Sequence, residues 1–163
     1  GFPTWGTLIS LSINGKIVLG IADFPALNER YVGYDKISYK LMNNKKRILK
    51  VKSNNLSKSI LSSTSTYAFK NKNDKNIFEK IQKKVKTVHM GGDCYQYCLL
   101  ADGYIDIVLE SGLNSYDIRA LIPIVKNSGG SIKTWDGEDP KNGGKVIATS
   151  SRKLLSTVQA LIT

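Results

Sequence analysis

Histidine and cysteine are scarce in this 163-residue chain, and their scarcity excludes several kinds of site. There is one histidine, His89, and there are two cysteines, Cys94 and Cys98. Two cysteines with no further Cys or His pair nearby do not make a zinc site. No Ser-His-Asp or Cys-His set for nucleophilic catalysis can be assembled either. We therefore interpret His89 as structural and the two cysteines, four positions apart on one expected helix face, as small core residues.

Long hydrophobic runs are also lacking. No run of about 18 apolar residues is present, so we expect no membrane-spanning helix. No charged-then-apolar leader opens the chain, and nothing in the cysteine content demands an oxidising compartment, so we expect a cytoplasmic protein. The chain opens on Gly1-Phe2-Pro3 without an initiator Met. We expect that an upstream part has been cut off or is unseen.

Acidic residues are outnumbered by basic ones, and the imbalance is local. The chain has 24 Lys and Arg against 13 Asp and Glu, but residues 36–86 hold 15 of the basic residues against only Asp74 and Glu79. A nucleic-acid binder can have such a charge distribution. The lysines are not interleaved with stacking aromatics, however, and no nucleic-acid motif is present. We interpret the region as a solvated surface and keep a basic nucleic-acid or protein interaction module as the alternative.

The first fifty residues predict an antiparallel meander. Asn14-Gly15 joins two runs that are rich in β-forming residues. Both positions of a tight hairpin turn need a positive φ, which Asn and Gly adopt readily. Further strands are expected before and after a second turn at Asn43-Asn44. The strands that this pattern predicts are Trp5–Ile13, Lys16–Ala22, Tyr31–Tyr34, Ile37–Met42 and Arg47–Val51.

The remainder predicts alternating strands and helices, which is typical of an α/β layer. We expect Asp74 to cap a helix over Asp74–Lys84. Pro123 should bend the helix that contains it, because proline cannot donate the backbone hydrogen bond. The expected helices are Asp74–Lys84, Asp93–Ala101, Ser115–Asn127 and Arg152–Ile162, and the expected strands are Ser59–Ser63, Thr87–Met90, Tyr104–Leu109, Ser131–Thr134 and Lys145–Ala148.

The stretch from Gly91 to Asp117 carries the most chemical information. Gly91-Gly92 precedes a helix, and a helix N-terminus favours anions. Asp117 lies in the first turn of the next helix, where it either caps the helix or binds a metal ion beside a phosphate. Glu110 ends a strand of buried character, where a carboxylate is costly unless it faces a cleft, a partner or solvent. On spacing alone these alternatives stay open.

The same residues resemble the inositol monophosphatase family, and within it most closely the histidinol-phosphate phosphatase branch. The family's Trp-Asp-Ile/Val helix start stands here as Tyr116-Asp117-Ile118, followed by the pair Gly129-Gly130. The run Gly-Gly-Asp-Cys-Tyr-Gln-Tyr-Cys, residues 91–98, is similar to the segment that wraps the substrate. The opening residues are similar to the strand pair after the family's metal-binding signature, so the resemblance covers essentially the whole chain.

This resemblance implies an α/β fold, namely the C-terminal portion of a layered αβαβα sugar-phosphatase-type fold. Antiparallel strands would be followed by a mixed sheet with flanking helices. Residues 1–53 would complete the first sheet, and residues 54–163 would form the C-terminal α/β layer with the substrate loop and one metal ligand.

The resemblance also implies an activity and assigns roles to residues. The parent protein would be a Mg²⁺-dependent phosphomonoesterase that acts on a small phosphorylated metabolite, either histidinol phosphate or inositol monophosphate. Asp117 would bind the metal. Glu110 would bind the non-phosphate part of the substrate. Gly91, Gly92 and Asp93 would contact the substrate, and an acid at Asp93 suits a cationic amine.

One departure matters, because the family's other metal ligands have no counterpart in this chain. They are a Glu and the two aspartates of an Asp-Pro-Ile/Leu-Asp-Gly-Thr motif, and all would precede Gly1. We therefore expect residues 1–163 to be inactive alone and to associate with the missing N-terminal half of the same protein or with a second copy as a homodimer. A non-catalytic remnant is the alternative.

Overall fold

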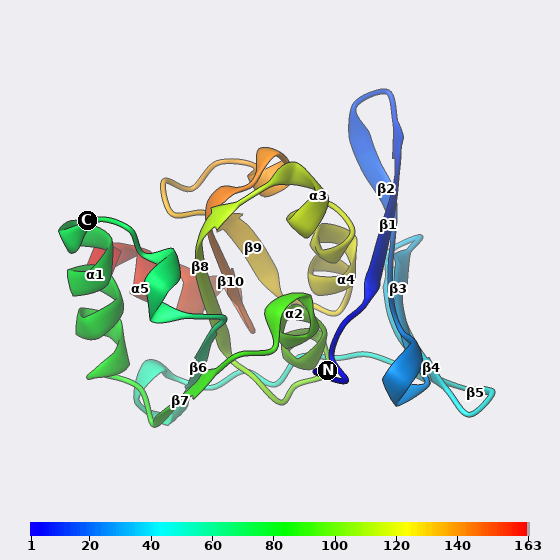
Figure 1. Ribbon diagram of the computed structural model, residues 1–163, viewed down its shortest axis with the longest axis horizontal. Helices are drawn as coiled ribbons and strands as arrows, with labels where there is room; N and C mark the ends of the chain where they lie inside the picture. The colour runs from blue at the N-terminus through cyan, green and yellow to red at the C-terminus, as the bar shows by residue number, and fades with distance from the viewer. Residues whose placement is uncertain (163) are drawn as a thin grey trace.

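The computed structural model describes residues 1–162, which form four layers (Figure 1). An antiparallel sheet, sheet A, forms one outer layer. Helices α2 (Asp93–Ala101) and α4 (Leu121–Asn127) separate it from the mixed sheet B. Helices α1 (Lys72–Gln82) and α5 (Arg152–Ile162) cover the far face of sheet B. Helix α3 (Ser115–Ile118) is a single turn that leads into α4.

Sheet A is a five-stranded meander in the order β1-β2-β3-β4-β5. Asn14 and Gly15 have φ of 50° and 74°, and Asn43 and Asn44 have φ of 50° and 59°, so both predicted turns are confirmed. A third turn of the same kind, at Asp35-Lys36, was not predicted. The strands are β1 (Thr7–Ile13), β2 (Lys16–Phe24), β3 (Glu29–Tyr34), β4 (Ile37–Met42) and β5 (Lys45–Ile48).

Sheet B has the strand order β7-β6-β8-β10-β9. Strand β6 pairs in parallel with both β7 and β8, whereas β10 pairs antiparallel with β8 and β9. The strands are β6 (Ile60–Ser63), β7 (Thr87–Met90), β8 (Ile107–Leu113), β9 (Ser131–Thr134) and β10 (Gly144–Thr149).

Two glycines bring sheet A into close contact with α4. A Cβ at Gly20 would lie 1.9 Å from the carbonyl oxygen of Ala120, and a Cβ at Gly33 would lie 2.4 Å from the backbone nitrogen of Ile124. The Ser38 hydroxyl donates to the carbonyl of Ile124 at 2.7 Å. The backbone of α4 therefore rests directly on the inner face of sheet A.

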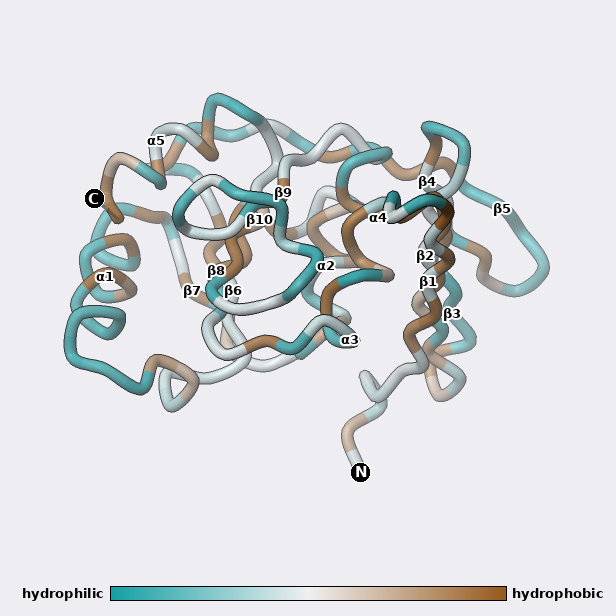
Figure 2. The backbone as a smooth tube through the Cα atoms, turned by 90° about the horizontal axis from the view of Figure 1, so that it is seen from above, coloured by the Kyte–Doolittle hydropathy of each residue, from teal (hydrophilic) through white to brown (hydrophobic). Residues whose placement is uncertain are grey.

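Two hydrophobic cores hold the layers together. One lies between the two sheets and includes Tyr97, Ile118 and Ile124. The other lies between sheet B and the outer helices and includes Phe78 and Leu154. The backbone coloured by hydropathy shows hydrophobic stretches on α4 and β8, and hydrophilic outer turns on α1 (Figure 2). None of the helices formed by residues 1–162 is long and apolar enough to cross a membrane.

The structure corrects several expectations about the elements. Asn71, not Asp74, caps α1, since its side chain accepts from the backbone N–H of Asp74. Asp74 is instead buried and paired with Lys145 at 2.7 Å. The helix predicted over Ser115–Asn127 is two helices, because Pro123 cannot donate a hydrogen bond to the carbonyl of Arg119. The strands predicted at Arg47–Val51 and Tyr104–Leu109 lie at Lys45–Ile48 and Ile107–Leu113.

The outer face of sheet A is apolar and open. Alternation along the strands turns one set of side chains toward α4 and the other set away from it. On the face turned away from α4, β1 presents three apolar side chains that are each about half exposed: Ile9, Leu11 and Ile13. Neighbouring strands add three further exposed side chains to this outer apolar face: Tyr34, Ile37 and Ile48.

Candidate functional site

The predicted site residues lie where the order of the strands in sheet B changes direction, because β7 is added on one side of β6 and β8 on the other. From strand β6, the chain crosses by α1 to the edge strand β7 on one side and then by α2 to the central strand β8 on the other. Crossovers of parallel strands are right-handed, so these two helices cover opposite faces of the sheet, as Figure 1 shows. Ligands of α/β proteins commonly bind at the carboxyl ends of strands at such a switch point. Gly91 follows β7 directly at this end.

The loop before α2 has an unusual backbone. Gly91, Gly92 and Asp93 have φ of 89°, 101° and 46°, so three successive residues are left-handed. The N–H of Gly91 donates to the carbonyl of Ser63 at 2.9 Å, which ties the loop to the end of β6. A Cβ at Gly91 would meet no atom within 4 Å, and Asp93 is exposed. The loop therefore faces open space, and the N–H groups of Asp93 and Cys94 precede the first backbone hydrogen bond of α2, which runs from the Tyr95 N–H to the Gly92 carbonyl at 2.8 Å.

Glu110 is a buried carboxylate, only 3% exposed, in the middle of β8. The expectation that it ends its strand is wrong, because β8 continues to Leu113. Its Oε1 atom accepts from the backbone N–H of Thr64, from Gln96 Nε2 at 2.9 Å and from Ser63 Oγ at 3.2 Å. Burial raises the pKa of Glu110, and these hydrogen bonds to the charged form oppose that rise.

Asp117 lies in the first turn of α3 and helps to cap it. Its Oδ2 atom accepts from the backbone N–H of Asn114 at 2.7 Å, and the Asn114 side chain accepts from the backbone of Asp117 in return. This reciprocal arrangement is a capping box. Capping uses one carboxylate oxygen, and Oδ1 has no hydrogen bond among the described residues, so capping and metal binding are compatible.

Three acidic residues lie close enough to Tyr97 for their charges to act on its hydroxyl. The charges of Glu110, Asp93 and Asp117 each raise the pKa of the Tyr97 hydroxyl, after the larger effect of its burial. Tyr97 is 1% exposed, and its hydroxyl has no hydrogen-bond partner within residues 1–162. Buried hydroxyl groups are nearly always hydrogen-bonded. The described residues therefore do not satisfy every polar group of this region.

The residues present fit one ligand of a magnesium ion rather than a complete site. Magnesium takes six oxygen ligands and is commonly bound by one or two carboxylates, substrate phosphate and water. Asp117 offers one oxygen of the right kind. Among residues 1–162, no group of three or more His, Cys, Asp or Glu side chains is placed to hold a metal ion.

The chain matches one protein family over nearly its whole length. The sequence profile of the inositol monophosphatase family matches residues 1–162. The chain belongs to the inositol monophosphatase family. The family resemblance and the α/β fold predicted from the sequence are thereby confirmed.

Three members of the inositol monophosphatase family illustrate the relationship. Bifunctional phosphatase IMPL2, chloroplastic, of Arabidopsis thaliana is 41% identical over 138 residues, which are 85% of this chain and 39% of the relative. A histidinol-phosphatase of Mycobacterium tuberculosis is 28% identical over 92% of this chain and 59% of its own length. A solved inositol monophosphatase from Zymomonas mobilis superposes with a TM-score of 0.90 at 36% identity, covering 98% of this chain and 63% of that one.

Compared with these relatives of the inositol monophosphatase family, the chain is short. It spans between about two fifths and just under two thirds of their lengths. The fold described above therefore corresponds to part of the family's fold.

The other residues singled out in the sequence take ordinary places in this family member. Cys98 is buried, Cys94 is partly buried, and both are free. Burial raises the pKa of the Cys94 thiol to about 12, so it is not a reactive thiolate. His89 is exposed on β7, and within residues 1–162 the structure records no contact that gives it the expected structural role.

A polar cluster beside the predicted site was missed. Glu29 accepts hydrogen bonds from Tyr31 and Tyr95, each at 2.8 Å, and forms an ion pair with Lys40. Burial would raise the pKa of Glu29, but the bonds from Lys40 and the two tyrosines outweigh it and lower the pKa. Glu29 belongs to β3 and Tyr95 to α2, so no local sequence pattern could have joined them.

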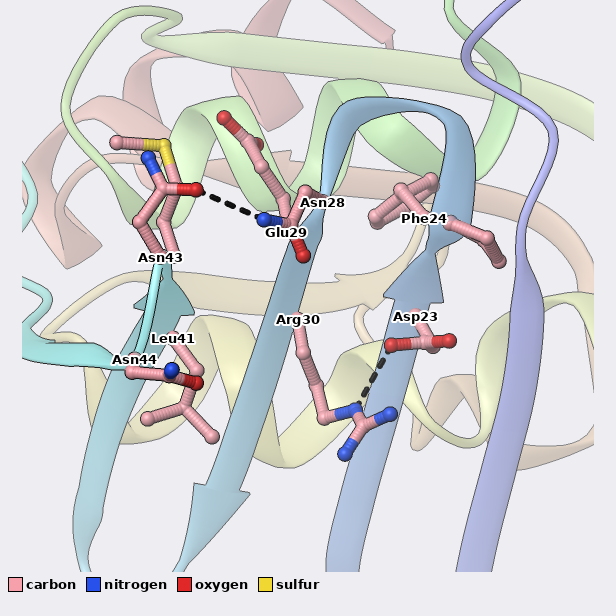
Figure 3. A pocket seen from close by; sticks show the side chains of 10 residues that line it. Asp23, Phe24, Asn28, Glu29, Arg30, Leu41, Asn43 and Asn44 are labelled. Atoms are coloured by element: carbon pink, nitrogen blue, oxygen red, sulfur yellow. Dashed lines mark hydrogen bonds and ion pairs between the residues drawn. The ribbon is translucent and has the colours of Figure 1, made fainter.

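Glu29 also borders a hollow of about 560 Å³ at the end of sheet A (Figure 3). Arg30 and Asp23 pair at 2.7 Å in this hollow, and Asn28 donates to Asn43 at 2.8 Å. None of the predicted site residues lines it. The hollow is therefore distinct from the region around Tyr97.

Proposed function

We propose that the parent protein of this chain is a Mg²⁺-dependent phosphomonoesterase and that histidinol phosphate is its substrate. The observation that supports this most is that Ser63, at the end of β6, joins the loop before α2 to the buried carboxylate: its carbonyl accepts from the Gly91 N–H at 2.9 Å, and its hydroxyl donates to Glu110 at 3.2 Å. Relatives named as histidinol-phosphatases and as a bifunctional phosphatase support the reaction class.

The proposed roles follow from the surroundings of each residue. Asp117 would hold the metal through the oxygen that its capping bond leaves free. Gly91 and Gly92 would approach the substrate closely, since the loop faces open space. The exposed Asp93 would pair with the substrate amine, and Glu110 would accept from its remaining polar groups. Bound magnesium would neutralise the phosphate charge.

The remaining metal ligands are proposed to lie in an upstream part of the same protein. The chain spans only part of the length of its relatives, and its own carboxylates supply one ligand. We therefore propose that residues 1–163 are inactive alone and act with that part. We also propose that the parent protein forms a homodimer and that it is located in the cytoplasm. The related IMPL2 of Arabidopsis thaliana is named as chloroplastic.

A substrate panel tests the proposed function. The full-length protein, assayed with and without Mg²⁺, should hydrolyse histidinol phosphate more efficiently than inositol 1-phosphate, which carries no amine. Asp93→Asn should raise the KM for histidinol phosphate about 10-fold, the effect of losing one charge-assisted hydrogen bond, and change the KM for inositol 1-phosphate little. Equal effects on the two esters would refute the amine contact. Preference for inositol 1-phosphate in the wild type would make that ester the substrate.

The distribution of positive charge disfavours the nucleic-acid alternative. Of the 15 basic residues of 36–86, four lie on β4 and β5 at one end of the molecule and three lie on α1 at the other, and the remaining eight are spread over turns, loops and a short 3-10 helix (Figure 1). Of these, Lys40 and Arg47 are in ion pairs with carboxylates. A nucleic-acid surface needs its charges on one face. A steep dependence of heparin or duplex binding on salt would support this alternative.

A further inference from the structure

We infer that Gln96 is a positioning residue for the substrate: it fixes the carboxylate of Glu110 so that one oxygen is left for the non-phosphate end of the ester. This inference rests on the proposed function and deepens it. Gln96 would act through Glu110 without touching the substrate itself.

The side-chain amide of Gln96 is held by hydrogen bonds on both of its atoms. Gln96 lies in α2 and is 1% exposed. Its Oε1 atom accepts from Ser62 Oγ at 2.8 Å. Its Nε2 atom donates to Glu110 Oε1 at 2.9 Å and to Thr64 Oγ1 at 3.0 Å. Two donors and one acceptor are thus all engaged, and the amide has one orientation.

This arrangement makes the two oxygens of Glu110 unequal. Gln96, the Thr64 backbone and the Ser63 hydroxyl all donate to Oε1. None of these hydrogen bonds ends on Oε2. A carboxylate whose first oxygen is fixed by three donors from two different elements has a fixed plane. Its second oxygen is therefore presented in a defined direction, as a substrate-binding group requires.

A buried amide at this position calls for a reason beyond packing. Burying an amide in a core costs free energy unless its hydrogen bonds are made, and leucine would fill nearly the same volume without that cost. The two donors and the acceptor of Gln96 all bond to polar groups on β8 and on or just after β6. The contact with Glu110 joins this amide to the proposed site.

The test compares Gln96→Leu and Gln96→Glu with the wild type in the full-length protein. Gln82→Leu, an exposed glutamine of α1, is the matched control. Each protein is assayed on histidinol phosphate and on phenyl phosphate, which has no amine or hydroxyl for Glu110 to bind. Gln96→Leu should raise the KM for histidinol phosphate about 10-fold with kcat changed less than threefold, and leave phenyl phosphate hydrolysis nearly unchanged.

The pH profile is a second readout that a purely structural role would not move. Losing a donor to the charged form of Glu110 should shift the acidic limb of kcat/KM for histidinol phosphate to higher pH in Gln96→Leu. The shift should be larger in Gln96→Glu, because a second carboxylate then faces Glu110. Gln82→Leu should behave as the wild type in every assay.

The possible outcomes separate the inference from the function on which it rests. A wild type that hydrolyses no phosphate ester refutes the proposed function. An active wild type whose Gln96 variants lose both substrates equally, or keep an unchanged KM and pH profile, overturns the inference. Should Gln96→Leu fail to fold, Gln96→Glu, which keeps the size and polarity of the side chain, decides between these outcomes.

Discussion

The buried carboxylate of Glu110 should leave a signature in the pH dependence of stability. Burial raises its pKa above the ordinary value of 4.5, so the folded state resists ionisation. For a group with a raised pKa, the stabilising contribution is complete below the unfolded pKa and is lost as pH rises through the folded pKa. Glutamine at this position cannot ionise.

We therefore expect Glu110→Gln in the full-length protein to gain stability relative to the wild type as pH rises from 4 to 8. Chemical denaturation at several pH values measures the difference in free energy of unfolding. A difference that stays constant over this range, or that moves against the variant, would show that burial does not raise the pKa of Glu110.

The hydrogen bond from Tyr95 to Glu29 should contribute to stability. Tyr95→Phe removes a donor to a partly buried charged group and should lower the free energy of unfolding by about 1.5 kcal/mol. Tyr67→Phe is the matched control, since Tyr67 is 91% exposed and should change stability by less than about 0.5 kcal/mol. Equal effects of the two substitutions would rule out a stabilising role for this bond.

The contact between sheet A and α4 depends on glycine. Gly20→Ala would place a methyl group 1.9 Å from the carbonyl oxygen of Ala120, so the sheet and the helix would have to separate. We expect a loss of at least about 3 kcal/mol, the upper range for an overpacked core. Ser12→Ala, an exposed position on the neighbouring strand β1, should be nearly neutral in the same thermal unfolding measurement. A stable, folded Gly20→Ala would mean that the two elements are less tightly packed.

Local sequence signals predicted most elements and failed where distant contacts decide. Asn14-Gly15 and Asn43-Asn44 carry their own turn conformations, so the meander was predictable. Aspartate commonly caps helices, but Asp74 lies within the first turn of α1, where it pairs with Lys145 of β10. Asn71 caps the helix instead. Pro123 was correctly expected to disturb its helix, yet only the structure shows two separate helices.

The same division applies to the candidate site. Gly91, Gly92, Asp93, Glu110 and Asp117 could be identified as candidate site residues from the sequence, because they lie in one continuous stretch of the chain. The burial of Glu110 depends on Ser63, Thr64 and Gln96, which belong to another strand end and to α2. Spacing alone could not reveal these contacts. The roles assigned to the site residues remain predictions.

The open face of sheet A should govern the behaviour of the isolated chain. The six exposed side chains of the outer apolar face, defined above, would lie in water if residues 1–163 were alone. Exposed apolar patches of this kind promote association. We expect purified 1–163 to form oligomers or aggregates in sedimentation velocity experiments, with Ile9→Thr/Leu11→Thr reducing association and Tyr67→Ser leaving it unchanged. A dilute, monomeric wild-type chain would contradict this expectation.

The central proposal concerns the molecule as a whole. We propose that this chain supplies one metal ligand and the substrate loop of a phosphatase, and that the other metal ligands lie upstream. The most direct test is phosphate release from histidinol phosphate, with and without Mg²⁺, by the full-length protein and by purified 1–163 side by side. We predict Mg²⁺-dependent turnover by the full-length protein, its loss in Asp117→Asn, and none by 1–163. Turnover by 1–163 alone, or a full-length protein that hydrolyses no phosphate ester, would contradict the proposal.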